Sequence, residues 1–146
     1  MTETLEIEIS TDKNKLQLNK IYQFLSEEAY WSKGLPRETF DKAIANSICF
    51  GVYLENGEQV AFARVVTDQA TFAYLADVFV NPAQRGKGIS KKLMKAIDAH
   101  PDLQGLRRFM LATADAHELY KQFGFTPLST PDRLMERHYK TVYQTS

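Results

Sequence analysis

The alternation of apolar and polar residues predicts three strands in the first half of the chain. Residues 5–10 alternate between aliphatic and polar side chains, which is the period-two pattern of a strand with one buried face. Residues 48–54 and 59–67 are richer in apolar side chains, and residues 55–58 between them contain Asn-Gly. Asn-Gly is the strongest short-range signal for a hairpin turn, so the two segments are predicted to pair as antiparallel neighbours.

Apolar residues at helical spacing predict two helices between the first and second strands. The first helix carries its apolar side chains on one face, and Thr11 or Asp12 is its candidate capping residue. These apolar residues are Leu18, Ile21, Tyr22 and Leu25. A second, shorter helix is predicted from Pro36 to Ile44, because proline is favoured at the first position of a helix.

The second half of the chain begins with a strand, a helix and another strand, which predict a crossover unit. Residues 71–80 are nearly continuous in apolar side chains, which predicts a central strand covered on both faces. A helix is predicted over residues 86–99 and a strand over residues 106–112. With the earlier hairpin, this order predicts an α/β (α+β) fold with a mixed, mostly antiparallel sheet and about four helices.

The last segment is predicted to hold a helix followed by one or two strands. Asp115 and Glu118 have the spacing of a capping box, and Gly124 supplies the helix stop. Residues 125–128 and 134–142 then have the composition of further strands. The sequence leaves the oligomeric state open, although exposed edge strands in this segment could pair between two chains and form a homodimer.

Composition and charge restrict the classes of partner. The chain has 146 residues with 44% hydrophobic and 25% charged residues, typical of one globular domain, which we predict over residues 1–146. Eighteen basic residues balance 18 acidic ones, so no overall positive charge favours nucleic acid. No apolar stretch is long enough to span a bilayer and the polar N-terminus lacks a leader pattern, so no membrane association is expected.

The cysteine and histidine residues predict a cytoplasmic protein without a metal. Cys49 is the only cysteine, which excludes an internal disulfide and fits a reducing compartment. It lies in an apolar run, where a buried strand residue is more common than a nucleophile. His100, His117 and His138 are far apart in the sequence and lack metal-ligand spacing.

The most informative segment is the turn between the apolar strand and the long helix. Gly86 and Gly88 lie at the predicted helix start, where the first N–H groups lack partners and the helix dipole is positive. This arrangement favours a phosphate or pyrophosphate group. Two common nucleotide motifs fit poorly, because the Walker pattern requires Ser or Thr after Lys87 and the dinucleotide pattern requires glycine at Lys91.

Two motifs resemble those of the GCN5-related N-acetyltransferase (GNAT) family. Arg85, Gly88 and Ser90 occupy the three defined positions of its motif A, Arg/Gln-x-x-Gly-x-Gly/Ala, with serine in place of Gly or Ala. Residues 119–125 read Leu-Tyr-Lys-Gln-Phe-Gly-Phe, which is similar to the family's Leu-Tyr-x-x-x-Gly-Phe element. The resemblance covers roughly the last two-thirds of the chain, with both motifs in the family's order.

The resemblance implies a GNAT-type fold and transfer of an acetyl group from acetyl-CoA to a primary amine of a small molecule or peptide. In this family the amine attacks directly within a ternary complex, motif A holds the pyrophosphate, and the preceding strand pairs with the pantetheine arm. The implied cofactor-binding residues are Val78, Phe79, Val80, Arg85, Gly86, Lys87, Gly88, Ile89, Ser90 and Asp115. For Asp115, a helix N-cap is an equally good interpretation.

Two residues are candidates for the chemical steps. Tyr120 matches the family's tyrosine that protonates the departing thiolate, and its alternative role is a core aromatic, since it shares helical spacing with apolar residues. Asp77 interrupts an apolar strand, where burial favours a neutral carboxyl group and makes it a better base. A structural hydrogen-bonding role for Asp77 is equally compatible with the sequence.

Three residues are candidates for contact with the acceptor. Tyr30 and Trp31 lie in the loop that covers the acceptor site in the family, with a packed helix junction as the alternative. Arg64 is a candidate for an acidic acceptor group, although pairing with Asp77 is the more conservative interpretation. The acceptor stays open, as does a rival function, a non-catalytic acyl-CoA-binding or regulatory module on the same fold.

Overall fold

A five-stranded sheet forms the centre of the computed structural model, which describes residues 6–144. The strands lie in chain order across the sheet. They are β1 Ile7–Ser10, β2 Ile48–Leu54, β3 Gln59–Thr67, β4 Phe72–Val80 and β5 Arg108–Leu111. The first four are antiparallel neighbours and β5 runs parallel to β4, which confirms the predicted mixed, mostly antiparallel sheet. Residue 5 of the predicted first strand lies outside the described residues.

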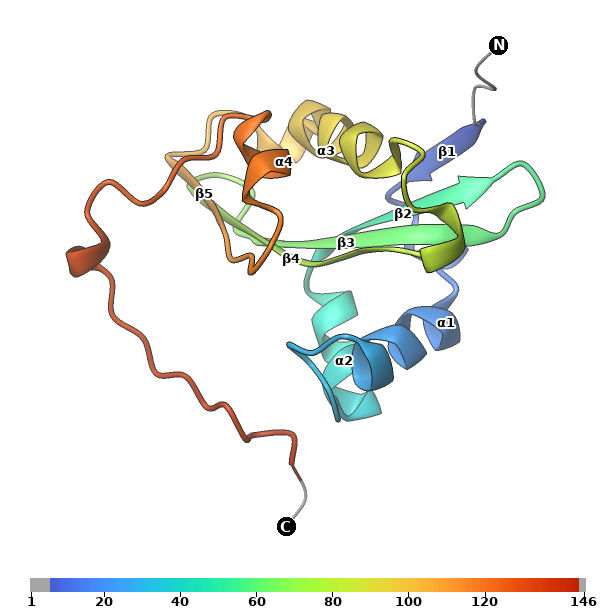
Figure 1. Ribbon diagram of the computed structural model, residues 1–146, viewed down its shortest axis with the longest axis horizontal. Helices are drawn as coiled ribbons and strands as arrows, with labels where there is room; N and C mark the ends of the chain where they lie inside the picture. The colour runs from blue at the N-terminus through green and yellow to red at the C-terminus, as the bar shows by residue number, and fades with distance from the viewer. Residues whose placement is uncertain (1–5, 145–146) are drawn as a thin grey trace.

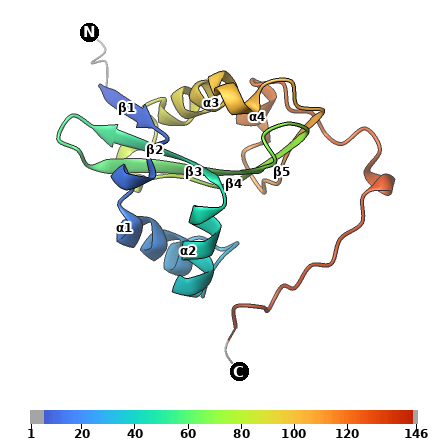
Figure 2. The same ribbon diagram turned by 180° about the vertical axis from the view of Figure 1, so that it is seen from behind.

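Helices cover both faces of the sheet, with α1, η2 and α2 on one side and α3 and α4 on the other (Figures 1 and 2). They are α1 Leu18–Gln23, the π-type turn η2 Phe24–Glu28, α2 Arg37–Ala45, α3 Ile89–Ala99 and α4 His117–Lys121. The 3-10 turns are η1 Lys13–Lys15, η3 Pro82–Gln84, η4 Pro101–Leu103 and η5 Pro131–Arg133. Within residues 6–144, no helix combines the length and apolar character needed to cross a bilayer.

Each face of the sheet packs against its own apolar core. Phe50, Leu93 and Ile97 are buried in the core between the sheet and α3. Ile21 and Phe40 are buried in the core between the sheet and the α1–α2 side. Because β2 and β3 are covered on both faces, they are apolar at consecutive positions instead of every second one.

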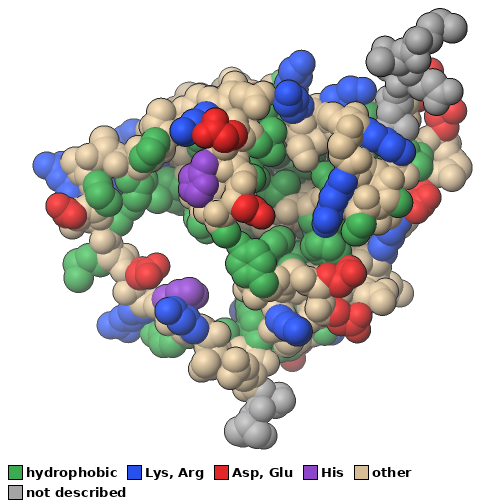
Figure 3. Space-filling view, in the orientation of Figure 1, with side chains coloured by type: hydrophobic (Ala, Val, Ile, Leu, Met, Phe, Trp, Pro, Cys, Tyr) green, Lys and Arg blue, Asp and Glu red, His purple; other side chains and the backbone are tan. Residues whose placement is uncertain are grey.

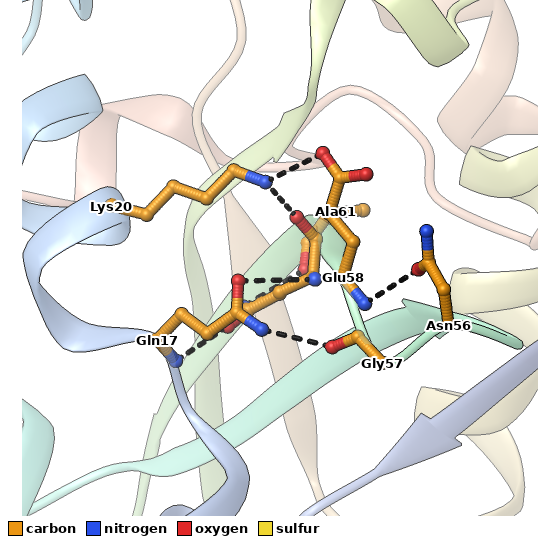
Figure 4. A network of polar contacts seen from close by, with 7 residues as sticks. Gln17, Lys20, Asn56, Gly57, Glu58 and Ala61 are labelled. Carbon is orange, nitrogen blue, oxygen red and sulfur yellow. Dashed lines mark hydrogen bonds and ion pairs between the residues drawn. The ribbon is translucent and has the colours of Figure 1, made fainter.

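The β2–β3 hairpin forms as predicted and is tied to the start of α1. Gly57 has a φ of 87°, a conformation that glycine adopts readily in a hairpin turn. Gln17 donates its N–H to Oε1 of the buried Gln59 at 2.8 Å, and Lys20 donates to Oε1 of Glu58 at 3.2 Å (Figure 4). These contacts fix α1 beside the beginning of β3, which pairs with the end of β4.

Two predicted helix caps are wrong. Asp12 caps η1, whereas α1 begins after Gln17 and has no side-chain cap. The helix α4 begins after Ala116, whose N–H donates to Oγ1 of Thr113 at 3.0 Å, so Asp115 is not its N-cap. Residues 13–17, which include η1, separate Asp12 from α1, whereas only Ala116 separates Asp115 from α4, and helix ends readily shift by one or two residues.

The strand β4 is less covered than its apolar run predicted. Phe72 is exposed, and Tyr74, Ala76 and Val78 are only half-buried. Phe72 and Tyr74 lie beside β5, so their exposure belongs to the face of β4 that is turned away from the α3 core. Beyond Leu75, β5 no longer pairs with β4. Among the described residues, no strand lies beside the rest of β4 on that side, so its last residues present a free backbone edge.

The chain after Phe125 forms an extended arm instead of the predicted strands. Residues 126–144, which we call the arm, contain η5 as their only regular element. Figures 1 and 2 show the arm leaving the body near β5 and ending on the side of α1 and α2. The strand predictions for residues 125–128 and 134–142 are therefore wrong for the single chain, because no described strand lies beside them to complete a ladder.

Candidate active site

The loop after β4 turns sharply into α3 through two glycines. Gly88 is the N-cap of α3, and Gly86 lies two residues before it. Their φ angles of 80° and 79° are in the left-handed region, where a β-carbon causes strain. A β-carbon at either position would meet no atom within 4 Å. Backbone conformation, and not crowding, therefore explains glycine here, and the space beside the loop is open.

The N–H groups at the start of α3 form a cluster of donors. Among the described residues, none of the N–H groups of residues 86–91 donates to a backbone carbonyl. The first backbone hydrogen bond of the helix runs from Lys92 to Gly88, at 3.2 Å. Unpartnered N–H groups beside open space, at the positive end of an 11-residue helix, fit a phosphate or pyrophosphate group.

The side chains of this loop contribute less than its backbone. Arg85 donates from Nε to the carbonyl of Val80 at 3.1 Å, and Lys87 donates from Nζ to Oε1 of Gln84 at 3.1 Å. Ile89 is buried in the core, so only its backbone is available to a ligand. The predicted residues of motif A therefore lie together at one helix start, where the backbone supplies most of the donors.

A β-bulge interrupts β4 at Asp77. Two residues of β4, Asp77 and Val78, lie opposite the single residue Ala63 of β3. Asp77 has a φ of 56°, which non-glycine residues rarely adopt, although Asp and Asn tolerate it best. The extra residue changes the phase of the strand: Leu75 and Val78 pack on the α3 side, whereas Phe79 packs on the α1 side.

Asp77 connects three segments that are far apart in the sequence. Its Oδ2 accepts from Nε of Arg64 at 2.8 Å, and its Oδ1 accepts from Nε1 of Trp31 at 2.9 Å. Arg64 also donates from Nη1 to Oγ of Ser47 at 3.1 Å. The side chains of Arg64 and Asp77 are 19% and 12% exposed. Arg64 thus pairs with Asp77, as the more conservative interpretation of the sequence predicted, and both carboxylate oxygens of Asp77 accept hydrogen bonds.

Tyr120 is a buried residue of α4. Its ring lies 6.0 Å from that of Phe125, at an interplanar angle of 74°. Burial, and then the negative charge of Asp115, raises the pKa of the Tyr120 phenol above its ordinary value of 10. The phenol is therefore protonated at neutral pH and has a proton to donate. Burial agrees with the interpretation of Tyr120 as a core aromatic residue, and it does not exclude a role as general acid.

The loop between η2 and α2 holds two exposed aromatic rings on an anchored backbone. Tyr30 and Trp31 are 70% and 45% exposed, and their rings lie 5.1 Å apart in an edge-to-face contact. The loop is anchored by the buried Ser32, which donates to the carbonyl of Leu25 at 2.7 Å. Such exposure disfavours a packed helix junction, and the two rings present an apolar wall.

Comparisons with known proteins decide the family. Residues 18–125 match the model of the acetyltransferase (GNAT) family. The chain belongs to this family. A crystal structure from Xanthomonas campestris pv. campestris, named as a candidate acetyltransferase of the GNAT family, is 52% identical and has a TM-score of 0.95 over 98% of this chain and 100% of that one.

Two further proteins extend the likeness. A protein of Gibberella zeae, named as a candidate acetyltransferase, is 35% identical over 133 residues, 77% of this chain and 74% of that protein. A structure from Deinococcus radiodurans R1 has a TM-score of 0.72 over 96% of this chain and 93% of that one. At 15% identity, this second likeness concerns the fold alone.

The predicted site residues of this GNAT protein fall into separate groups. Hydrogen bonds join Trp31, Arg64 and Asp77, and motif A gathers at the start of α3. Among the described residues, no hydrogen bond connects Tyr120 to either group. Cys49 is buried in β2, and burial raises the pKa of its thiol to about 11, so it has the character of an inert core residue.

A pocket of about 230 Å³ beside the end of β4 escaped the sequence analysis. Its lining includes Phe24 and Phe79, whose rings stack 4.0 Å apart, and the exposed Glu27 and Glu28. The adjacent residues Glu27 and Glu28 are the sequence feature that could have indicated this pocket. Only the fold shows that η2 carries them to the bulged strand.

Replacing Asp77 by alanine should lower the free energy of unfolding by about 1–3 kcal/mol, because Arg64 would remain mostly buried without its partner. Asp77→Asn should lose less, because asparagine tolerates the same φ and keeps an acceptor for Trp31. Asp41→Ala removes an exposed ion pair with Arg37 and is the control, with an expected loss of about 0.3–0.5 kcal/mol. Urea unfolding followed by circular dichroism measures all three, and equal losses at positions 77 and 41 would contradict the assignment.

Proposed function

We propose that this GNAT protein transfers an acetyl group from acetyl-CoA to a primary amine of a small molecule or peptide. The observation that carries the proposal is the cluster of unpartnered N–H groups at residues 86–91, which follows directly on the free edge of β4. Backbone edges bind extended chains by strand addition, and the amides of a pantetheine arm suit such an edge. When bound, acetyl-CoA supplies an activated thioester.

The backbone around motif A is the proposed binding element for the cofactor. Residues 78–80 would hold the pantetheine arm, and the N–H groups of residues 86–91 would hold the pyrophosphate. The half-buried Ser90 adds a hydroxyl in the first turn of α3, and Arg85 and Lys87 add positive charge. Asp115, which is exposed just before α4, remains a proposed cofactor contact.

Tyr120 is the proposed general acid that returns a proton to the departing thiolate. Its raised pKa keeps the proton on the phenol at neutral pH. The family motif Leu-Tyr-x-x-x-Gly-Phe, which here spans residues 119–125, supports this role. The core position of the ring holds the hydroxyl in one place, which favours transfer along a fixed path.

We propose that Asp77 positions the acceptor wall and does not act as a general base. Its carboxylate accepts hydrogen bonds from Arg64 and Trp31 and is only 12% exposed, so it is held within the protein and little of it is open to an incoming amine. The bond to Trp31 instead fixes the indole ring beside the bulged strand. Arg64, which also donates to Ser47, is engaged within the protein and less suited to the predicted contact with an acidic acceptor.

The pocket beside Phe79 supports a cationic acceptor, because two carboxylates line it and the one cation of its lining, Lys20, is paired with Glu58. Glu27 and Glu28 lie at the rim of the space beside Phe79, where carboxylates attract an ammonium group and the stacked rings accommodate an apolar portion. A primary amine is protonated in neutral water, so the carboxylates attract it as an ammonium group, and it must release a proton to water before its nitrogen attacks the thioester.

A panel of amines incubated with acetyl-CoA tests the proposal, with free thiol release as the measurement. We expect release that depends on one class of primary amine and is absent without an acceptor. The rival, a non-catalytic acyl-CoA-binding module, predicts calorimetric binding of acetyl-CoA without thiol release on any amine. Absence of both binding and release would contradict both functions.

Trp31→Ala should raise the KM for the acceptor about threefold to tenfold, because an aromatic contact contributes about 0.5–1.5 kcal/mol beyond its buried area. The Kd for acetyl-CoA should not change. Trp31→Phe keeps an aromatic ring but loses the hydrogen bond to Asp77. Its KM, compared with that of Trp31→Ala, separates the contribution of the ring from that of the hydrogen bond. Steady-state kinetics with the best amine of the panel measure both variants, and an unchanged KM in Trp31→Ala would exclude the ring from the acceptor site.

A further inference from the structure

Arg64 is the one charged residue of β3 and lies in its buried part. Residues 59–63 and residue 65 of this strand are buried, so Arg64 interrupts a run of buried positions. A charged side chain at such a place is costly unless it is paired. Asp77 provides the partner, but a buried ion pair is seldom more stable than apolar side chains of similar size. The stability of the fold alone therefore does not explain an arginine at this position.

The bulge of β4 brings Asp77 to the side of the sheet on which Arg64 lies. Arg64 is the partner of Ala76 across the two strands, and neighbouring residues of a regular strand point to opposite faces. A regular β4 would therefore turn Asp77 away from Arg64. The φ of 56° at Asp77 changes the direction of its side chain, and Oδ2 accepts from Nε of Arg64 at 2.8 Å. The irregular backbone and the ion pair thus occur together at one residue.

Four hydrogen bonds form a continuous chain through Arg64, which we call the Arg64 relay. The hydroxyl of Ser47 donates to the carbonyl of Ala43 at 2.7 Å and accepts from Nη1 of Arg64 at 3.1 Å. Arg64 also donates to Asp77, which in turn accepts from Nε1 of Trp31 at 2.9 Å. Ala43 belongs to α2, Ser47 lies directly before β2, and Trp31 lies in the loop before α2. The relay therefore ties the segments on either side of α2 to β3 and β4.

The position of the Trp31 ring depends on this relay. Within residues 6–144, the indole forms a hydrogen bond only with Asp77 and a ring contact only with Tyr30. Tyr30 is more exposed than Trp31, so it gives the ring little support. Hydrophobic side chains lie at the centre of the face shown in Figure 3, beside the opening between the arm and the body. Without the hydrogen bond to Asp77, the exposed indole would be free to turn in solvent.

We propose that Arg64 is a positioning residue, which fixes the ring of Trp31 through Asp77 before the acceptor binds. This inference rests on the proposed acetyl transfer, in which the ring forms the acceptor wall. A ring that is already held in place loses less rotational freedom on binding than a free one, so the acceptor binds more tightly. The planar guanidinium suits this role, because its Nε and Nη1 hold two partners in one fixed geometry.

Arg64→Met should raise the KM for the acceptor about threefold to tenfold, and by no more than Trp31→Ala does, because Arg64 acts through the Trp31 ring. The Kd for acetyl-CoA should not change. Arg64→Lys keeps the charge but cannot hold Ser47 and Asp77 in the same geometry, so its KM should lie between those of the wild-type chain and Arg64→Met. In a chain that already carries Trp31→Ala, Arg64→Met should not raise the KM further. A merely structural arginine would change the kinetics by the same factor with and without the ring.

Arg37→Met is the matched control. Arg37 donates from Nε to Oδ1 of Asp41 at 2.9 Å and from Nη1 to Oδ1 of Asn19 at 2.8 Å, which is the same pattern as at Arg64. Its side chain is exposed at the start of α2, and among the described residues no hydrogen bond connects it to Trp31. Its replacement should leave the KM for the acceptor unchanged. Circular dichroism confirms that each variant is folded at the assay temperature.

Fluorescence measures the position of the ring without turnover, because Trp31 is the only tryptophan of the chain. In the wild-type chain we expect the time-resolved anisotropy to decay with the rotation of the whole molecule. Arg64→Met should add a fast component from local motion of the indole, and Arg37→Met should not. Arg64→Lys should give a smaller fast component than Arg64→Met.

Three results would each overturn the positioning role. They are an unchanged anisotropy in both Arg64 variants, the same fast component in Arg37→Met, and a KM effect of Arg64→Met that persists in full without the Trp31 ring. If no amine is acetylated, the proposed function fails, whereas the anisotropy still decides whether Arg64 holds the ring. The two proposals can therefore fail separately.

Discussion

Replacing Tyr120 by phenylalanine is expected to lower turnover about 100- to 10,000-fold while acetyl-CoA still binds. The substitution removes the proposed proton donor and leaves the buried aromatic ring in place. The rate of free thiol release gives kcat, and calorimetry gives the Kd for acetyl-CoA. A variant with unchanged kcat would show that Tyr120 is only a core residue.

Tyr53→Phe provides a matched control. The Tyr53 hydroxyl is buried in β2 without a hydrogen-bond partner among the described residues, so its removal leaves no other group unsatisfied. We expect normal turnover and undiminished stability from this variant. A comparable loss of turnover at positions 53 and 120 would indicate a general effect on the fold and would remove Tyr120 from its proposed role.

The pH dependence of turnover gives a second test of Tyr120. A general acid works in its protonated form, so its contribution is lost as the pH rises through its pKa. Burial and then Asp115 raise the pKa of Tyr120 above its ordinary value, so this loss comes at a higher pH than for an exposed tyrosine. Between about pH 7 and 9 turnover should not fall on account of Tyr120. A fall in that range that disappears in Tyr120→Phe would show that Tyr120 itself loses its proton there, which would contradict its raised pKa.

Gly88→Val is expected to weaken acetyl-CoA binding at least about tenfold, because a β-branched residue is strained at a φ of 80° and the loop must shift. The shift would misdirect the N–H groups of residues 86–91, which are the proposed pyrophosphate ligands. Calorimetry measures the Kd, and thermal unfolding measures the accompanying loss of stability.

Gly57→Val is the control for this prediction. Gly57 lies in the β2–β3 hairpin with a φ of 87°, and as at Gly88 a β-carbon would meet no atom within 4 Å. Both variants should therefore lose similar stability through backbone strain, about 1–2 kcal/mol. Only Gly88→Val should lose affinity. Equal affinities in the two variants would place the cofactor elsewhere.

The parts of the fold that depend on neighbouring residues were predictable from the sequence. The strands at residues 48–54 and 59–67 match β2 and β3, because the turn at Asn56-Gly57 fixes their register locally. The glycines of motif A likewise fix the start of α3 through their own backbone conformation. Such local backbone geometry depends on a few adjacent residues, so their sequence is enough to predict it.

The misjudged parts depend on partners that sequence spacing does not reveal. The arm has the composition of a strand, but strand formation needs a neighbour, and the single chain offers none. The apolar run of β4 predicted a strand buried on both faces. In the structure, the side chains that face the α3 core lie at odd positions before Asp77 and at even positions after it, so apolar residues follow one another without both faces being covered. The hydrogen bond between Asp77 and Trp31 joins residues 46 positions apart, and no sequence motif predicts this contact.

The bulge in β4 makes the number of residues in this strand matter more than their identity. Ala73 and Leu75 face the α3 core before it, and Val78 and Val80 face the same core after it. Deleting Asp77 would turn the last two side chains to the opposite surface and bring Phe79 into a space shaped for valines. Exchange of one aliphatic residue for another along β4 should therefore be tolerated, whereas a gain or loss of one position would move every later side chain of the strand that leads into the glycine loop before α3.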